Sequence, residues 1–352
     1  MSNTKNNNKV DAGSFYEEYH GHKLDELEII HSQLADSAET TIFLAGDSSL
    51  DNKHWFFSDE TGFNKASQVC SKNNRPDFVA SAVNGYEGVL QPPAMVKDVA
   101  YWMNFLAAER YGPGKILTIN TSVEESTVAE RMRSRSGLLP HDEFIREKVG
   151  RNDVVVLSVG GNDVALRPTI STIASVLTIT RMPMWLIRKM GRHTPGWGHL
   201  EWLFHDQVEK IVQRIAATGT PPKKVIVCMI YYLDERPGGS WADFTLRALG
   251  YDAHPEKLKL IIRLLFERIR ERGFQARPSA PRRRHGDKKR PAEGKKGGEK
   301  DAEAEPGGRS GGGVVPFPLF EVLDGTDPGD YVQRVEPSVA GGRKMAAALL
   351  AA

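Results

Sequence analysis

Cysteine is scarce in this sequence, and a long apolar run is missing. The 352 residues include two cysteines, Cys70 and Cys228, which argues against a disulfide framework and favours a reducing compartment, the cytoplasm. The first ten residues have no apolar core of the kind that a secretory signal needs. The longest apolar segment, residues 169–187, is interrupted by Arg181 and Pro183 and falls short of the ~20 apolar residues of a membrane span. We therefore expect no membrane-spanning segment.

Motifs for nucleotides and metals are missing as well. The sequence has no Gly-rich phosphate loop, Walker pattern or dinucleotide fingerprint. His193, His199 and His205 have neither cysteine partners nor the regular spacing of a zinc site. We expect neither a cofactor nor a bound metal.

Basic charge is concentrated in one segment. Residues 277–313 carry eleven Lys and Arg against six Asp and Glu, so the rest of the chain has a net charge of −3 although the whole has +2. The segment has nine glycines and no aromatic or branched aliphatic residue, which predicts a disordered insertion. A tether for nucleic acid or an acidic membrane is the alternative. Nucleic acid is the less favoured partner, because no aromatic side chain offers bases a stacking platform.

The remaining residues predict one α/β domain, over residues 39–276 and 314–352, after a disordered or helical lead-in at 1–38. Helical patterns separate five strand-like apolar runs. Such βαβ units close into a parallel sheet covered by helices on both faces, a three-layer α/β/α sandwich. The expected strands cover residues 41–45, 78–83, 153–159, 225–231 and 314–322. The clearest helical patterns lie between Pro92 and Gly112, at 200–217 and at 255–272.

The functional region of such a sheet lies beyond the carboxyl ends of its strands. The first run ends at residues 46–49, GDSS, which is either a simple turn held by Asp47 or the position of a nucleophilic Ser48. After the second run, Gly88 would let a backbone N–H approach a ligand closely. After the third run, the amide of Asn162 can donate a hydrogen bond. A serine with these two donors nearby could stabilise an oxyanion.

Three motifs, GDSS (46–49), GYEG (85–88) and GGND (160–163), resemble those of the SGNH hydrolases, also called GDSL esterases and lipases. The resemblance runs from about residue 41 to the C-terminus. It implies a five-stranded parallel sheet of flavodoxin-like order, with Ser48 as nucleophile and Gly88 and Asn162 in the oxyanion hole. The stretches VEEST, SVGGNDVAL and MIYYLDE are similar to an uncharacterised eukaryotic branch of the family. This similarity does not indicate a substrate.

The last block of that family, Asp-x-x-His-Pro, is incomplete in this chain. In one register Glu336 stands in the position of the general-base histidine and Gln333 in that of the aspartate. In a second register Asp327 replaces the histidine. The sequence contains no histidine beyond His285.

A serine hydroxyl needs a positioned base, and three accounts remain open. Glu336 or Asp327 could act if burial raised its pKa from near ~4.3. His54, six residues after Ser48, could substitute, although its neighbours Trp55 and Phe56 also fit a packed loop. The third account is a protein that keeps the pocket without catalysis.

The sequence therefore predicts a serine esterase or other acyl hydrolase of a small-molecule, lipid or carbohydrate ester. The alternative is a catalytically impaired binding protein that uses the oxyanion hole to hold an acyl, acetyl or carboxylate group. The substrate and the oligomeric state do not follow from the residues.

Overall fold

The computed structural model describes residues 9–57, 65–66, 75–217, 220–276 and 313–352. The expected insertion at 277–313 lies outside these residues, except that Gly313 begins the last strand of the central sheet.

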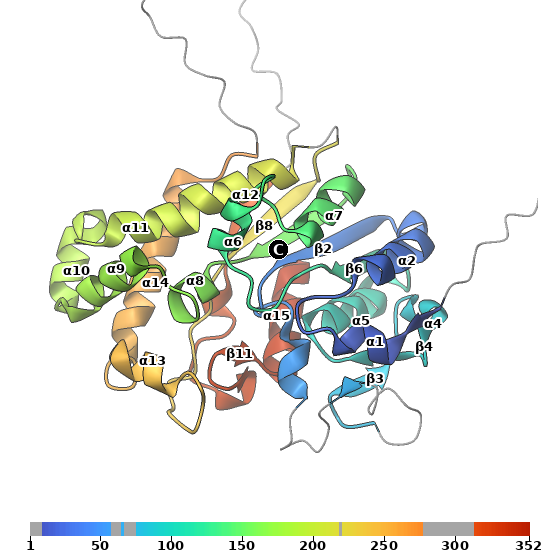
Figure 1. The fold of residues 1–352 in the computed structure, drawn as a ribbon, viewed down its shortest axis with the longest axis horizontal. Coiled ribbons are helices and arrows are strands. Elements are labelled where there is room, and N and C mark those ends of the chain that lie inside the picture. Colours follow the sequence, from blue (N-terminus) through green and yellow to red (C-terminus); the bar gives the residue numbers. More distant parts are fainter. Residues whose placement is uncertain (1–8, 58–64, 67–74, 218–219, 277–312) are drawn as a thin grey trace, which may run out of the picture.

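Five parallel strands form the central sheet, in the order β6-β2-β7-β8-β9 (Figure 1). Taken in chain order, this is 2-1-3-4-5, the flavodoxin-like order. Residues 42–44 of β2 pair with β6 on one side and with β7 on the other. The chain therefore adds β6 on one side of β2 and all later strands on the other side. The expected fold class is confirmed. The strands are β2 Thr40–Gly46, β6 Ile116–Asn120, β7 Val154–Ser158, β8 Lys224–Met229 and β9 Gly313–Pro318.

The prediction of the second strand is wrong. Residues 78–83 contain only the short strand β3, Val79–Ser81, which pairs antiparallel with β5, Ala94–Val96, outside the central sheet. The second strand of the sheet is β6, which the sequence analysis did not assign. The short strands β1 Val10–Asp11, β4 Leu90–Gln91, β10 Tyr331–Val332 and β11 Glu336–Pro337 form two further pairs, β1 with β4 and β10 with β11.

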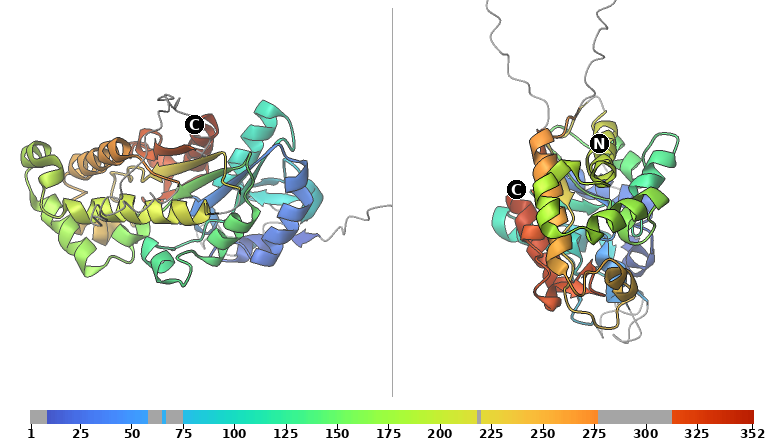
Figure 2. Two further views of the ribbon diagram at one scale, coloured as in Figure 1. Left: turned by 90° about the horizontal axis from the view of Figure 1, so that it is seen from above. Right: turned by 90° about the vertical axis from the view of Figure 1, so that its left-hand side faces the viewer.

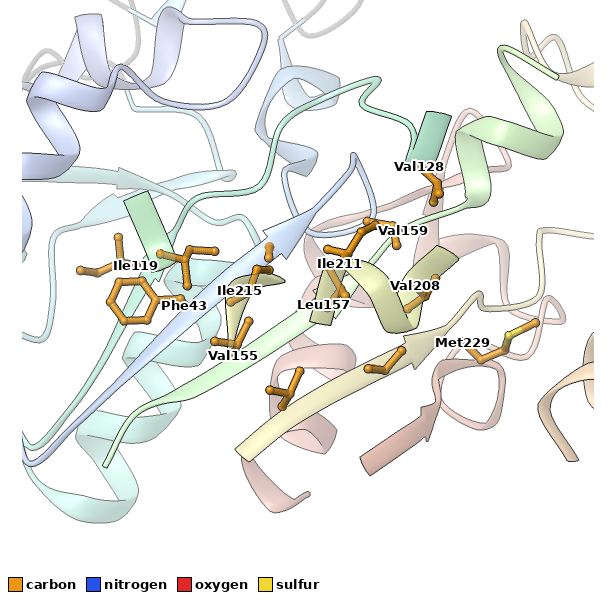
Figure 3. Packing of buried hydrophobic residues seen from close by; sticks show 14 of the residues in the cluster. Phe43, Ile119, Val128, Val155, Leu157, Val159, Val208, Ile211, Ile215 and Met229 are labelled. Carbon is orange, nitrogen blue, oxygen red and sulfur yellow. The ribbon is translucent and has the colours of Figure 1, made fainter. Parts of the chain in front are cut away.

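Side chains alternate between the two faces of the sheet along each strand, and both faces are buried. Phe43 and Leu157 face one core, together with Ile211 and Ile215 of α12 (Figure 3). Ile42, Leu44 and Val156 face the other core, which α5 and α15 cover. Figure 2 shows the helices on either side of the sheet. This confirms the three-layer arrangement.

Fourteen helices are labelled within the described residues, and the expected helix at 255–272 is found with those bounds as α14. The expected helix at 200–217 is instead a succession of α11, a π-helical turn at Trp202–Gln207, and α12. The bounds are α1 Ala12–Glu17, α2 Leu24–Leu34, α4 Tyr86–Val89, α5 Val99–Tyr111, α6 Val128–Arg133, α7 Pro140–Lys148, α8 Gly161–Ala165, α9 Ile170–Arg181, α10 Met184–Met190, α11 Trp197–Glu201, α12 Val208–Ile215, α13 Asp243–Ala248, α14 Pro255–Arg272 and α15 Val339–Ala351.

The segment treated as a lead-in supplies two of these helices, α1 and α2. Phe15 and Tyr16 of α1 and Leu27 and Ile30 of α2 are buried in the same core as Phe43. The described part of residues 1–38 therefore belongs to the α/β domain. Within the described ranges, no helix taken singly has the length and apolarity to cross a membrane, whereas α9 and the following segment Met184–His193, bent by 112°, meet that test as a pair.

Candidate active site

Ser48 lies directly after β2, in a turn whose geometry requires glycine. A Cβ at Gly46, where φ is +149°, would come within 2.0 Å of the carbonyl oxygen of Ser158 in β7. The two backbones therefore approach closely, and the N–H of Asp47 donates to that same oxygen at 3.1 Å. The Asp47 carboxylate accepts hydrogen bonds from the Ser49 backbone and hydroxyl, at 3.1 and 2.7 Å. Asp47 thus holds the turn, as expected from the sequence.

The Ser48 hydroxyl donates a hydrogen bond to Glu336 Oε1, over 3.2 Å. Both residues are buried. Glu336 Oε2 is buried without a hydrogen-bond partner among the described residues. Burial raises the pKa of Glu336 to about 8, with a further rise from the charge of Asp47 and an opposing effect of the Ser48 hydrogen bond. The carboxyl group in the position of the family's histidine therefore contacts the serine.

A β-hairpin positions Glu336. Glu336 is the first residue of β11, which pairs antiparallel with β10, and the turn between the two strands contains Arg334 in a left-handed conformation (φ 66°). Arg334 forms ion pairs with Asp243 and Asp252 at 2.7 and 2.9 Å. After β11, the Ser338 hydroxyl accepts hydrogen bonds from the first backbone N–H groups of α15. Two anchored segments thus flank Glu336.

A second buried acid, Glu124, belongs to the same region. It lies in the loop after β6, where its Oε1 accepts a hydrogen bond from the Trp55 indole at 3.2 Å. Its Oε2 is buried and, like that of Glu336, has no described partner. Burial and then the charge of Glu336 raise the pKa of Glu124 to about 10. Glu124 is not among the residues predicted from the sequence, because its place beyond a central strand becomes visible only once β6 is assigned.

A buried ion pair lies beside these acids. Lys53 Nζ is 2.7 Å from Asp51 Oδ1, and neither side chain is exposed. Asp51 Oδ2 also accepts the backbone N–H of Glu124 at 3.3 Å. Lys53 is thus paired with Asp51, and no cation is recorded against the carboxyl of Glu336 among the described residues.

Asn162 reaches the site from the adjacent strand β7, at the first turn of α8. Its Nδ2 donates to the carbonyl oxygen of Ser126 at 3.2 Å, and it lines the same cavity as Ser48. The next residue, Asp163, accepts the backbone N–H groups of Val128 and Ala129 at the start of α6. The end of β7 is thereby fixed relative to the loop that follows β6.

The structure does not bring Gly88 to Ser48. Gly88 lies in α4, its N–H donates to the carbonyl of Gly85 at 3.0 Å, and it does not line the cavity at Ser48. The reason is the error in the second strand, because β3 is outside the central sheet and its end is elsewhere. The loop that follows the true neighbour of β2 is 121–127.

The other proposed bases also lie away from the serine. His54 is exposed, and its ring packs edge-on against Tyr19 at 4.3 Å between centroids. Asp327 begins a short helical turn and pairs with Lys344 at 3.4 Å. Gln333, in the position of the aspartate, accepts the backbone N–H of Trp241. In the part of the chain that the structure describes, no histidine lines the cavity or hydrogen-bonds Ser48.

Ser48, Asn162 and Glu336 share one cavity of about 110 Å³. Apart from Thr245, its polar lining is gathered near the serine, where Ser49 and Ser158 hydrogen-bond each other at 2.7 Å. The rest of the lining is mainly aliphatic and aromatic. The arrangement places a serine hydroxyl, a carboxyl group and a side-chain amide around one cavity whose remaining lining is mainly apolar.

No family model and no curated protein matches the chain. Among solved structures, it is similar to a variant of an acetyl xylan esterase from Geobacillus stearothermophilus, with 14% identity, coverage of 90% of this chain and 94% of that one, and a TM-score of 0.41. A second is an alpha/beta hydrolase enzyme, LAE5, from the metagenome of Lake Arreo, with 13% identity, 90% and 95% coverage and a TM-score of 0.40. A third, described as a GDSL-like lipase from Parabacteroides merdae, has 12% identity, 90% and 95% coverage and a TM-score of 0.39.

What those proteins act on says nothing of the substrate of this chain at such low identity. The strand order, and the positions of Ser48 after β2 and Asn162 after β7, are observed in this chain independently of those comparisons. On these grounds the chain has a flavodoxin-like three-layer α/β/α fold, with a serine and an asparagine beyond the ends of two neighbouring strands.

Proposed function

We propose that the protein is a serine hydrolase of carboxylic esters in which Glu336 acts as the general base. The observation that carries the proposal is the hydrogen bond from the Ser48 hydroxyl to Glu336 Oε1, 3.2 Å long, inside a cavity at the carboxyl edge of the sheet. This contact lies within the range at which a base can take a proton from its nucleophile, given the looser geometry of an unliganded site.

The reaction divides into two halves. Ser48 Oγ attacks the ester carbonyl while Glu336 takes its proton, and the carbonyl oxygen becomes an oxyanion. Collapse of this intermediate breaks the bond to the alcohol oxygen, which takes the proton back from Glu336 and leaves. Water then attacks the acyl group on Ser48 while Glu336 accepts one of its protons. Collapse of this second intermediate breaks the bond to Ser48 Oγ, which takes the proton back from Glu336, and the carboxylic acid is released.

The amide of Asn162 and the backbone N–H of Ser48 are the donors proposed for the oxyanion. Both belong to the edge where β2 and β7 end, and the amide lines the cavity with the serine hydroxyl. Among the described residues no acceptor is recorded for the Ser48 N–H. Donors fixed before the reaction contribute to catalysis because they need no reorganisation as charge develops. Gly88 has no part in this proposal.

Burial makes Glu336 suitable as a base. An ordinary carboxylate is too weak a base at neutral pH, whereas a pKa of about 8 lies near the operating range that general-base catalysis favours. Glu124, whose pKa is raised further, stays protonated when Glu336 ionises. The two acids then carry one negative charge between them, which is how neighbouring buried carboxyls avoid mutual repulsion.

The competing function is an acyl- or carboxylate-binding protein without turnover. It is favoured by the same raised pKa, because at pH 7 most Glu336 is neutral and cannot take a proton from Ser48. In that case the cavity and the Asn162 amide would bind a ligand without cleaving it. The two functions differ in whether Ser48 reacts.

Labelling and turnover separate the two functions. We expect the protein to be labelled by a fluorophosphonate at pH 8.5 and to hydrolyse p-nitrophenyl butyrate, with both activities lost in Ser48→Ala. Ser49→Ala is the matched control, since the Ser49 hydroxyl bonds Asp47 and Ser158. Labelling that persists in Ser48→Ala, or no labelling and no turnover in the folded wild type, would overturn the proposal.

A further inference from the structure

The cavity at Ser48 continues beyond the catalytic groups as an apolar space. Away from the serine it is lined by side chains of α8, α13, α14 and the segment after β8, including Val164, Ile230, Leu246, Leu249, Leu258 and Ile262. Among the described residues away from the serine, Thr245 of α13 is the one polar side chain in this lining, and the others are apolar. A polar group placed there would lose its water without compensation.

The apolar space extends deeper into the helical layer. A second cavity of about 30 Å³ shares Val164, Ile230, Leu258 and Ile262 with the first, and its remaining lining is also apolar. A cavity measured in this way needs ~10–15 Å³ for each water-sized group, so the larger space alone has room for roughly seven to eleven such groups. An acetyl group would leave most of it empty.

Several polar groups near the serine already take part in hydrogen bonds within the protein. The Ser49 hydroxyl bonds Asp47 Oδ1 and Ser158 Oγ, each at 2.7 Å, and the Tyr231 hydroxyl donates to the carbonyl of Val335 at 2.7 Å. These hydrogen bonds favour a substrate that makes few polar contacts beyond its ester group. In the proposed mechanism, Ser48, Asn162 and Glu336 are the lining residues that contact the ester group.

The rim of the cavity also carries exposed apolar side chains. Trp241 lines the cavity, is 41% exposed, and stacks on Trp55 with 6.1 Å between ring centroids. Together these two aromatic rings extend the apolar lining of the cavity to its exposed edge.

We propose that this cavity is an acyl-chain site and that the substrate is an ester of an unbranched aliphatic acid of medium length. This inference rests on the proposed function for its reaction. The alcohol must leave beside Glu336, which returns the proton to it, whereas the deeper cavity contains neither Glu336 nor Val335. The chain of the acid, not of the alcohol, therefore enters the apolar space.

Two substrate series test the assignment. Across p-nitrophenyl acetate, butyrate, hexanoate and octanoate we expect kcat/KM to rise about fourfold for each methylene that leaves water for the cavity. Between the isomers methyl nonanoate and octyl acetate, we expect the nonanoate to be hydrolysed faster. Turnover that depends on Ser48 but is highest for acetate, or faster turnover of octyl acetate, would overturn the acyl-chain site while leaving the hydrolase intact.

A filled cavity provides the second test. Ile262→Trp places a large ring between the two cavities and is expected to lower octanoate turnover at least tenfold while sparing acetate. Leu264→Trp is the matched control, since Leu264 is on the same helix, is partly buried, and lines neither cavity. Equal losses on acetate and octanoate in the folded Ile262→Trp variant would contradict the proposal.

Binding tests the site separately from catalysis. Decanoate should displace cis-parinaric acid from Ser48→Ala and much less from the Ile262→Trp variant. Failure of this displacement would overturn the acyl-chain site even where Ser48 hydrolyses esters. Displacement without any turnover by the wild type would instead overturn the hydrolase and retain the site.

Discussion

Two pairs of buried ionisable side chains lie side by side in this protein and are satisfied to different degrees. Asp51 and Lys53 have no exposed surface and are 2.7 Å apart, so each charge has a partner. Glu124 and Glu336 are two acids, and each has one buried oxygen without a described partner. The first pair carries two opposite charges in contact, whereas in the proposed mechanism the second pair holds a proton beside the reacting serine.

The difference follows from what burial does to each pair. An ion pair can remain charged in a low dielectric when its partners are in contact, although the loss of hydration offsets much of the attraction. Two acids cannot both ionise there, and the pKa of each rises. A protein gains no stability from the second arrangement. Its retention beside a serine is therefore an argument for function.

Replacing Glu336 should separate activity from stability most strongly. We expect Glu336→Gln to lower kcat/KM by about 10²–10⁴, the usual contribution of a general base. Between the ordinary carboxyl range and pH 8, the folded chain keeps a proton on Glu336 that the unfolded chain has released, so stability falls by about 1.4 kcal/mol per pH unit.

The neutral glutamine removes this loss. Glu336→Gln should therefore match the wild type in stability at pH 5 and exceed it at pH 8, measured by urea unfolding at both pH values. A variant that loses activity and is destabilised at both pH values would show that Glu336 is only structural.

Breaking the ion pair should have the opposite effect on stability. Lys53→Met leaves Asp51 buried without its cation, which is expected to cost about 3–5 kcal/mol of unfolding free energy. Lys115→Met is the control, because Lys115 and Glu39 form an exposed pair at 3.4 Å that is worth less than about 1 kcal/mol. Urea unfolding of both variants checks this comparison, and equal effects would contradict it.

Local sequence predicted the parts of the fold that depend on local patterns. The runs that became β2, β7 and β8 are buried on both faces and are therefore continuously apolar, and α14 has a clear helical stripe. Residues 78–83 and β6 are both short, mainly apolar runs, and β6 is interrupted by Thr118 and Asn120. Membership in the central sheet depends on pairing with β2, and such pairing leaves no local signal.

The candidate site shows the same limit. Ser48 and Asn162 could be placed because each follows a recognisable strand, whereas Gly88 was misplaced together with its strand. Glu336 was identified as standing in the histidine's position, but its contact with Ser48 spans 288 residues and required the fold. Glu124 was missed for a related reason, because nothing in its neighbourhood indicates that it will be buried near another acid.

The pH dependence of hydrolysis gives the smallest and sharpest effect. Glu336 must be ionised to accept the Ser48 proton, so activity should rise with pH around a midpoint near 8, and roughly tenfold between pH 7 and pH 9. A histidine base would give a midpoint near ~6.5. Glu124→Gln should keep the midpoint, because Glu124 is already neutral when Glu336 ionises. The profile of kcat/KM for p-nitrophenyl butyrate measures this, and a midpoint near that of histidine would contradict the assignment of Glu336 as the base.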